Sequence, residues 1–242
     1  QKKRADRITA AGAAVEKHNA DPAAAIRFYE EQAAKMPAWH VAKAIDITAA
    51  AGTTFETLPD GSLFVSGTQG RGSIISFAAT VDDVRKLTGL RLEAIPDPRL
   101  PVGGAGRAPD GSFVVSEISV DVAPASQPGG TTPLIRQKPQ ADFAADRFPV
   151  TQAADNDGSN PERGWSVAPR QQEVHWAVFE LSGAPEIKEP ARVTVKIRQS
   201  FKGGRHELGR FRISFTSSPL PLAIGVVPRG AELAAIPSDK RS

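Results

Sequence analysis

Cysteine is absent from this chain of 242 residues. Its absence excludes a disulfide framework, cysteine-ligated zinc, a thiol nucleophile and the Cys-x-x-Cys-His attachment of c-type haem. Apolar residues make up 40% of the sequence, so a chain of this length can bury a core that needs no covalent links. The composition is therefore compatible with an exported protein.

Long hydrophobic runs and a strong charge of one sign are missing as well. No apolar stretch reaches about 18 residues, which predicts that the chain has no transmembrane segment. The 30 basic and 27 acidic side chains leave a formal net charge of only +3. Apart from Gln1-Lys-Lys-Arg4, no basic run with interleaved aromatic residues occurs, so we predict no nucleic-acid partner.

Familiar catalytic signatures are also missing. The sequence has no Gly-x-Ser-x-Gly elbow, no His-Glu-x-x-His pair and no phosphate-binding loop. The four histidines, at positions 18, 40, 175 and 206, are too scattered to indicate a metal centre. We predict that the chain is not an enzyme, although paired carboxylates of the glycosidase type would leave no signature in the sequence.

Turn-forming residues are abundant, with 20 Pro and 21 Gly. They separate short segments of alternating or β-branched character, a pattern typical of a sandwich or jelly roll. The predicted strands are His40–Ile47, Thr53–Leu58, Leu63–Gly67, Ile74–Ala79, Gly89–Ala94, Phe113–Val122, Trp165–Val167, His175–Leu181, Arg192–Gln199 and Gly209–Thr216. Pro124–Pro133 is predicted to be a surface loop or a hinge. The expected fold is mainly β, an antiparallel jelly-roll sandwich.

The N-terminal part of the chain is rich in Ala and differs in composition from the rest. Asp21 suits an N-cap and Pro22 the first position of a helix, so we expect an α-helical hairpin over residues 1–38. The sandwich is expected over 39–218 and an extended Pro-rich tail over 219–242. Because the chain starts at Gln1 with no hydrophobic signal region, we interpret it as a processed product or a piece of a longer protein.

One phrase occurs twice. Leu58-Pro-Asp-Gly-Ser62 and Ala108-Pro-Asp-Gly-Ser112 both precede an apolar segment. The repeat indicates either an internal duplication or a common turn that feeds a strand, and we favour the turn.

Several phrases occur in a recognisable order between residues 39 and 218. They are Trp39, Leu58-Pro-Asp-Gly-Ser, Gly89-Leu-Arg-Leu-Glu-Ala with Pro96-Asp-Pro, Gly104-Ala-Gly-Arg, Gly111-Ser-Phe-Val-Val-Ser-Glu, Gly164-Trp-Ser-Val, His175-Trp-Ala-Val-Phe and His206-Glu-Leu-Gly-Arg-Phe-Arg-Ile-Ser. This order resembles a module of the large exported planctomycete-type proteins that carry a cytochrome-c-like domain. The resemblance implies a jelly roll similar to galactose-binding or concanavalin-like modules, located outside the cytoplasm in the periplasm or at the cell surface. It assigns no functional residue.

Arg210 and Arg212 are the first candidate ligand-binding residues. On a strand they share one face, and His206 lies near the same predicted hairpin. The opposite face is expected to hold Phe211, Ile213 and Phe215. The three polar residues then form a cationic rim that donates hydrogen bonds to a sugar hydroxyl, carboxylate or sulfate. The alternative is a solvated face or a set of ion pairs with carboxylates of neighbouring strands. The carboxylates considered are Glu93, Glu117 and Glu180.

Trp176 and Arg107 complete the candidate ligand-binding set. Sugar-binding platforms need exposed aromatic rings, but aromatic residues make up only 6% of this chain, with three tryptophans. Trp176 alternates with His175, so one of the two is expected to face outward. The alternative places at least two of the three tryptophans in the core.

A loop rich in oxygen donors lies at Asp155-Asn-Asp-Gly-Ser-Asn160. Asp155 and Asp157 are candidate ligands for a structural calcium ion, although the spacing of an EF-hand is missing. The alternative is a plain Asx/Gly turn. We predict no other cofactor in this chain.

Together these patterns predict a non-catalytic binding module of a larger exported protein. Its expected partner is a glycan. The alternative is a structural or assembly module that docks neighbouring domains or subunits of an extracytoplasmic complex.

Overall fold

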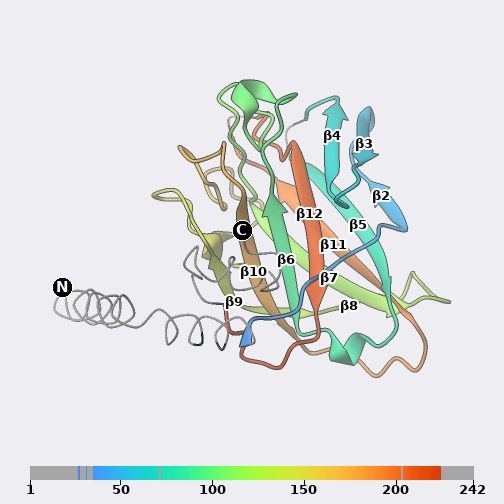
Figure 1. The fold of residues 1–242 in the computed structure, drawn as a ribbon. Helices are drawn as coiled ribbons and strands as arrows, with labels where there is room; N and C mark the ends of the chain where they lie inside the picture. The colour runs from blue at the N-terminus through green and yellow to red at the C-terminus, as the bar shows by residue number, and fades with distance from the viewer. Residues whose placement is uncertain (1–26, 28–30, 32–34, 71, 203, 225–242) are drawn as a thin grey trace. The chain divides into compact units, whose positions relative to one another are not determined.

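The computed structural model describes residues 27, 31, 35–70, 72–202 and 204–224 (Figure 1). The chain divides into two compact units, one from Ala38 to Leu222 and the other comprising 1–37 and 223–242. Apart from isolated positions, the predicted helical hairpin lies outside the described residues, as does most of the predicted tail. Within the described part of the chain, no helix combines the length and the apolar character that a bilayer crossing requires.

The unit from Ala38 to Leu222 contains two antiparallel sheets, which confirms the predicted mainly β sandwich (Figure 1). In the described residues, the first sheet has seven strands in the order β3-β4-β12-β6-β10-β9, with β1 also paired to β12. Its strands are β1 (His40–Val41), β3 (Thr53–Thr57), β4 (Leu63–Gly67), β6 (Gly89–Ala94), β9 (Ile135–Ala141), β10 (His175–Ser182) and β12 (Arg210–Thr216). The second sheet has five strands in the order β2-β5-β11-β7-β8. They are β2 (Asp46–Thr48), β5 (Ser73–Val81), β7 (Glu117–Pro124), β8 (Thr132–Pro133) and β11 (Ala191–Gln199).

Successive strands change sheets along much of the chain. From β4 to β7 each strand lies in the sheet opposite to the one before it, and β10, β11 and β12 alternate in the same way. This alternation is the connectivity of a jelly roll. It also places the connections that cross between the sheets at the ends of the sandwich. Among the described residues, three short 3-10 helices lie in connections between strands. They are η1 (Val84–Lys86), η2 (Pro101–Gly103) and η3 (Val150–Ala153).

The core lies between the two sheets and follows the alternation of the strands. In β12, Phe211, Ile213 and Phe215 are buried and face inward, as predicted. The neighbouring strand β6 continues this buried face, because Ile213 is paired in register with the buried Leu92. Burying such side chains contributes about 1.5–3 kcal/mol each, so the apolar interior holds the two layers together without covalent links.

Neither the connection from β6 to β7 nor the connection from β11 to β12 forms a β-hairpin. The pair β6 and β7 and the pair β11 and β12 each have one member in either sheet. Both edges of β11 are already paired, with β5 and with β7, so β12 has no edge of β11 to join. The predicted hairpin that would bring His206 beside Arg210 and Arg212 is therefore wrong, since the chain crosses the end of the sandwich between them.

Other strand boundaries also differ from the prediction. His40–Ile47 is divided between the two sheets as β1 and β2. The predicted loop Pro124–Pro133 ends in β8, and β9 was not predicted. Strand β9 is an edge strand that contains Pro139, and Lys138 beside it has a positive φ of 42° where the register with β10 shifts. Proline and bulges are tolerated at sheet edges, so Pro139 and the bulge are compatible with a strand at this position.

Candidate functional site

A pocket of about 400 Å³ lies among the connections between strands. Its walls come from four segments that are far apart in the sequence: 112–114, 143–148, 166–169 and 201–206. The volume falls within the range of roughly 300–1,000 Å³ that is typical of small-molecule sites. Of the residues singled out in the sequence, His206 lines this pocket.

Aromatic rings form much of the pocket wall. Phe143, Phe148, Phe201 and His206 all line it, and each is partly exposed. Phe201 stands edge to face against Phe148, with ring centroids 5.7 Å apart, and against His206, with centroids 4.8 Å apart. Edge-to-face packing fixes the orientation of rings, so these side chains form a shaped surface rather than a loose apolar patch.

His206 presents a hydrogen-bond acceptor in its neutral form. Its Nδ1 lies 2.6 Å from the carbonyl oxygen of Gly204. Because a carbonyl oxygen can only accept, the proton of the neutral ring is on Nδ1. Nε2 is then left with a free lone pair.

Ser112 belongs to one of the two repeated turns, which adopt the same structure. In Asp110-Gly111-Ser112, Asp110 Oδ1 accepts from the Ser112 backbone N at 3.0 Å and from Ser112 Oγ at 2.7 Å. In Asp60-Gly61-Ser62 the same two bonds measure 3.0 and 2.6 Å. Gly61 and Gly111 have φ values of 76° and 75°, which only glycine adopts without strain. The Ser112 hydroxyl therefore donates its hydrogen to Asp110, so its oxygen can act only as an acceptor toward the pocket.

Phe143 is held in place from behind the pocket. Its backbone oxygen accepts a hydrogen bond of 3.1 Å from the indole Nε1 of Trp165, which is fully buried. The Phe143 ring packs against His175, with centroids 5.4 Å apart, and the Arg170 guanidinium lies 4.8 Å from its centroid. Trp165, His175 and Arg170 thus fix one wall of the pocket without lining it.

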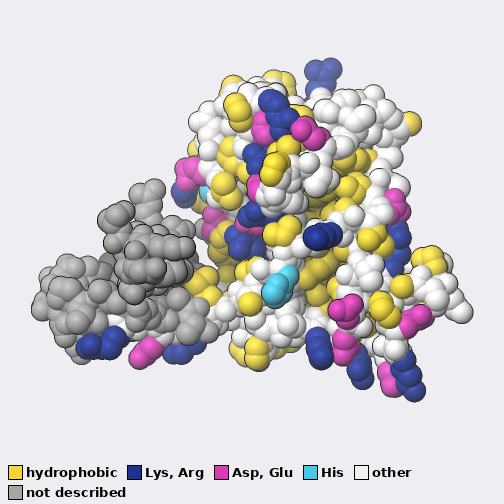
Figure 2. Space-filling view, turned by 45° about the vertical axis from the view of Figure 1, so that its right-hand side comes forward, with side chains coloured by type: hydrophobic (Ala, Val, Ile, Leu, Met, Phe, Trp, Pro, Cys, Tyr) yellow, Lys and Arg dark blue, Asp and Glu magenta, His cyan; other side chains and the backbone are white. Residues whose placement is uncertain are grey.

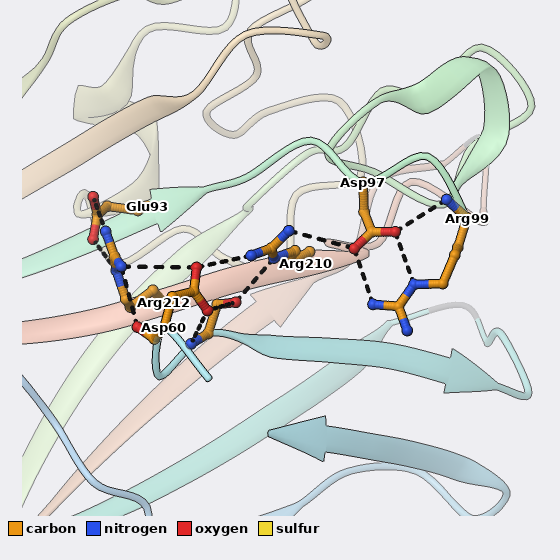
Figure 3. A network of polar contacts seen from close by, with 7 residues as sticks. Asp60, Glu93, Asp97, Arg99, Arg210 and Arg212 are labelled. Carbon is orange, nitrogen blue, oxygen red and sulfur yellow. Dashed lines mark hydrogen bonds and ion pairs between the residues drawn. The ribbon is translucent and has the colours of Figure 1, made fainter. Parts of the chain in front are cut away.

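Arg212 lies elsewhere, on the outer face of the seven-stranded sheet (Figure 3). Its guanidinium donates to both carboxylate oxygens of Glu93, at 2.7 and 3.0 Å. Glu93 is buried and also accepts from Arg91 Nη2 at 2.8 Å. Of the carboxylates considered as alternative partners, Glu93 binds Arg212, whereas Glu180 pairs with Lys138 and Glu117 with Arg136.

Arg210 joins the same network (Figure 3). Its Nη2 donates to Asp60 at 2.8 Å, its Nε donates to Ser62 Oγ at 2.9 Å, and its Nη1 lies 3.4 Å from Asp97. Asp97 in turn binds Arg99. Because these guanidinium groups are engaged by carboxylates of the chain, the face resembles the predicted ion-paired alternative more than a free cationic rim.

Trp176 lies on the same sheet face as Arg212, since both are cross-strand neighbours of Glu93, whereas Arg107 occupies a further place. Trp176 faces outward from β10 and is half-buried, with its ring centroid 6.0 Å from the Arg91 guanidinium, while His175 is buried. Arg107 is buried and donates to Glu207 at 3.0 Å and to the Gly67 carbonyl at 2.5 Å. Burial lowers the pKa of the Arg107 guanidinium, and the charge of Glu207 opposes this change. The five candidate ligand-binding residues are therefore divided among three separate places.

Asp155 and Asp157 are bound by an arginine. Arg163 donates to Asp155 Oδ2 at 2.7 Å and to Asp157 Oδ2 at 3.2 Å. Across the described residues, no group of three or more His, Cys, Asp or Glu side chains is arranged to hold a metal ion. The Arg163 guanidinium supplies the positive charge that a calcium ion would bring to these carboxylates.

Figure 2 shows Lys and Arg side chains intermixed with Asp and Glu on the face that it draws, without a broad patch of one sign there.

The sequence interpretation missed Phe143, Phe148 and Phe201. They lie in irregular segments, so no strand or helix periodicity marks them. The available signal was weak. These aromatic residues stand in segments rich in Ala, Pro and Asp, which predict loops, and an aromatic residue in a loop can indicate a binding surface.

Comparisons with known proteins give two distant structural neighbours. No protein-family model matches the sequence, and no curated protein matches it. One neighbour comes from work on the promiscuous specificity of carbohydrate-binding modules from the beta-sandwich superfamily, with a TM-score of 0.31, 10% identity and coverage of 72% of this chain and 54% of that one. The chain thus spans about half the length of this neighbour. The other is the family 11 carbohydrate-binding module of the cellulosomal cellulase Lic26A-Cel5E of Clostridium thermocellum, with a TM-score of 0.29, 8% identity and coverage of 74% and 95%. Likeness at this level says nothing of the ligand of this chain.

Proposed function

We propose that this chain is a non-catalytic glycan-binding module and that a sugar ring occupies the pocket between Phe143, Phe148, Phe201 and His206. The observation that carries this proposal is the convergence of three partly exposed phenylalanines on one pocket with a few polar groups. A pyranose ring has one face rich in C–H groups, which packs on aromatic rings, and hydroxyls that need hydrogen-bond partners. The hydroxyls of Ser112 and Ser166, His206 Nε2 and the Asp146 carboxylate supply such partners.

Binding fits this pocket better than hydrolysis. Glycosidases use two carboxyl groups that flank the scissile bond, about 5–10 Å apart. Among the described residues that line the pocket, Asp146 is the one carboxylate, and Asp110 beside the pocket already accepts two hydrogen bonds from Ser112. The pocket therefore supports recognition of a sugar.

Affinity electrophoresis tests the proposal. The chain is run through gels that contain neutral, acidic or amino polysaccharides, and we expect retardation in at least one of them. Phe148→Ala should abolish the retardation, because it removes a wall of the pocket. Phe64→Ala is the matched control, since Phe64 is partly exposed outside this pocket. Equal retardation of both variants, or migration unaffected by every polysaccharide, would refute a glycan site here.

A docking role is the second candidate function. A groove of about 550 Å³ runs beside β1 and β2, and Val41 and Ile45 next to it are 43% and 54% exposed. Exposed apolar side chains beside a groove support a contact with a neighbouring domain or subunit. Sedimentation of the chain with the other domains of its parent protein tests this: Ile45→Asp should abolish co-sedimentation and leave glycan retardation unchanged.

The proposed setting is a larger extracytoplasmic protein with a cytochrome-c-like domain. It is supported by the order of phrases between residues 39 and 218. The coding sequence on either side of this chain tests the setting. A Cys-x-x-Cys-His motif there would support it, and an uninterrupted gene for a protein without one would oppose it.

A further inference from the structure

The two repeated turns differ in what they bind. At Asp60-Gly61-Ser62, the Arg210 guanidinium donates to Ser62 Oγ at 2.9 Å and to Asp60 Oδ2 at 2.8 Å. Each oxygen thus accepts from a cationic N–H group while the serine hydrogen stays on Asp60 Oδ1. The molecule itself shows that this Asp-Gly-Ser turn is a receptor for a cation that carries N–H donors.

The second turn, Asp110-Gly111-Ser112, has the same internal bonds, but no cationic side chain of the described residues binds it. Among the described residues, no side chain donates to Ser112 Oγ or to the Asp110 carboxylate other than Ser112 itself. Ser112 is only 4% exposed, yet it lines the pocket. Its Oγ donates to Asp110 and keeps lone pairs that can accept a further hydrogen bond, and the pocket is the side from which a donor can reach it.

The other polar groups of the pocket are also suited to a cation that carries N–H donors. Asp146 is exposed and carries a negative charge, and His206 presents a lone pair on Nε2 when neutral. Arg147 and Arg205, their neighbours in the chain, do not line the pocket, and Arg170 behind Phe143 is paired with Glu173. The polar surface of the pocket therefore consists mainly of acceptors, with negative charge from Asp146 and, beside it, from Asp110.

We propose that the sugar bound in this pocket carries a free amine, and that its ammonium group is held by Ser112 Oγ and the carboxylates of Asp110 and Asp146 against the phenylalanine rings. Aromatic faces attract ammonium groups through their quadrupoles, so the walls and the acceptors favour the same ligand. An acidic sugar would instead meet the carboxylates of Asp110 and Asp146, which form no ion pair with Lys or Arg among the described residues. The inference rests on the proposed glycan-binding function and adds to it the charge class of the ligand.

The test compares three tetrasaccharides that share a β-1,4-linked backbone, made of glucosamine, N-acetylglucosamine or glucose. Calorimetric titration of the full chain should give the tightest binding for the glucosamine tetramer. Asp146→Asn keeps the shape of the side chain and removes its charge, and it should reduce this affinity by about three- to tenfold. Glu186→Gln is the matched control, because Glu186 is an exposed carboxylate that does not line the pocket.

The outcomes separate the inference from the proposed function. If the glucose or N-acetylglucosamine tetramer binds as tightly as the glucosamine tetramer, the charge class is wrong and the glycan site stands. Loss of affinity in Glu186→Gln equal to that in Asp146→Asn would show general attraction of a polycation and would also overturn the inference. If none of the three tetramers binds and polysaccharide gels show no retardation, the proposed function itself fails.

Discussion

Phe201 meets His206 edge to face, with ring centroids 4.8 Å apart and planes inclined at 71°. The same Phe201 ring meets Phe148 at 72°. Phe201 is therefore the middle member of an aromatic row, and His206 ends the row with a nitrogen that can accept a hydrogen bond. His206 has two separable roles, as a wall and as an acceptor.

Substitution of His206 should separate these roles. His206→Phe keeps an aromatic ring against Phe201 but removes the acceptor, so we expect glycan affinity to fall about three- to tenfold, in line with one lost hydrogen bond. His206→Ala removes the wall as well and should weaken binding further. Calorimetric titration measures both effects. If His206→Phe binds as tightly as the unaltered chain, Nε2 is not an acceptor for the ligand.

The Glu93–Arg212 pair should matter for stability and not for glycan binding. Arg212→Met leaves the buried Glu93 carboxylate with Arg91 alone, which should cost about 1–3 kcal/mol of unfolding free energy. The double variant Glu93→Gln/Arg212→Met should recover part of this loss, because the buried carboxylate charge is removed, although Arg91 then loses its own ion pair. Urea denaturation gives the four free energies of the cycle. A loss of polysaccharide retardation in Arg212→Met would instead place the ligand on this sheet face.

Acid should weaken the network through Asp97. The side-chain hydrogen bonds from Arg99 hold the pKa of the Asp97 carboxyl below its usual value, against the effect of burial. A lowered folded-state pKa means that ionised Asp97 stabilises the fold above the ordinary value of about 3.9, and that this contribution disappears as the pH falls through the folded-state value. Asp97→Asn should therefore cost about 1–2 kcal/mol near neutral pH and much less in strong acid. Denaturation at both pH values checks this, and an equal loss at both would contradict the role of the charge.

Calcium should compete with Arg163 for Asp155 and Asp157. The guanidinium bridges the two carboxylates, so we expect millimolar calcium to leave the Tm of the unaltered chain unchanged. In Arg163→Ala the carboxylates face each other without a cation, and calcium should raise the Tm relative to a chelator. Differential scanning calorimetry measures both. A calcium-dependent rise in the unaltered chain would support the calcium site predicted from the sequence.

The sequence correctly predicted which side chains of β12 face the core, but it did not predict which strands pair with one another. The alternation of Phe211, Ile213 and Phe215 with arginines predicted the inward and outward sides of β12, because side chains alternate with a period of two in any strand. It could not show that β12 pairs with β6, since pairing depends on which edges the rest of the chain leaves free. His206 and Arg210 are four residues apart, yet the chain crosses between the sheets there and separates their surroundings.

The pocket was hidden from the sequence for a related reason. Its walls come from four segments whose meeting depends on the whole topology. By contrast, the repeated Pro-Asp-Gly-Ser phrase correctly predicted two turns, because that structure depends only on neighbouring residues and on glycine with positive φ.

Magnetic resonance of the tryptophan and histidine side chains tests the central claim most directly. A nitrogen-labelled chain is titrated with the glucosamine tetramer and then with the glucose tetramer. Ligand in the pocket should shift the ring signals of His206 and the indole N–H signal of Trp165, which is bonded to Phe143, while the indole signal of Trp176 stays in place. A shift of the Trp176 signal with those of His206 and Trp165 unmoved would put the sugar on the outer face of the sheet and contradict this account.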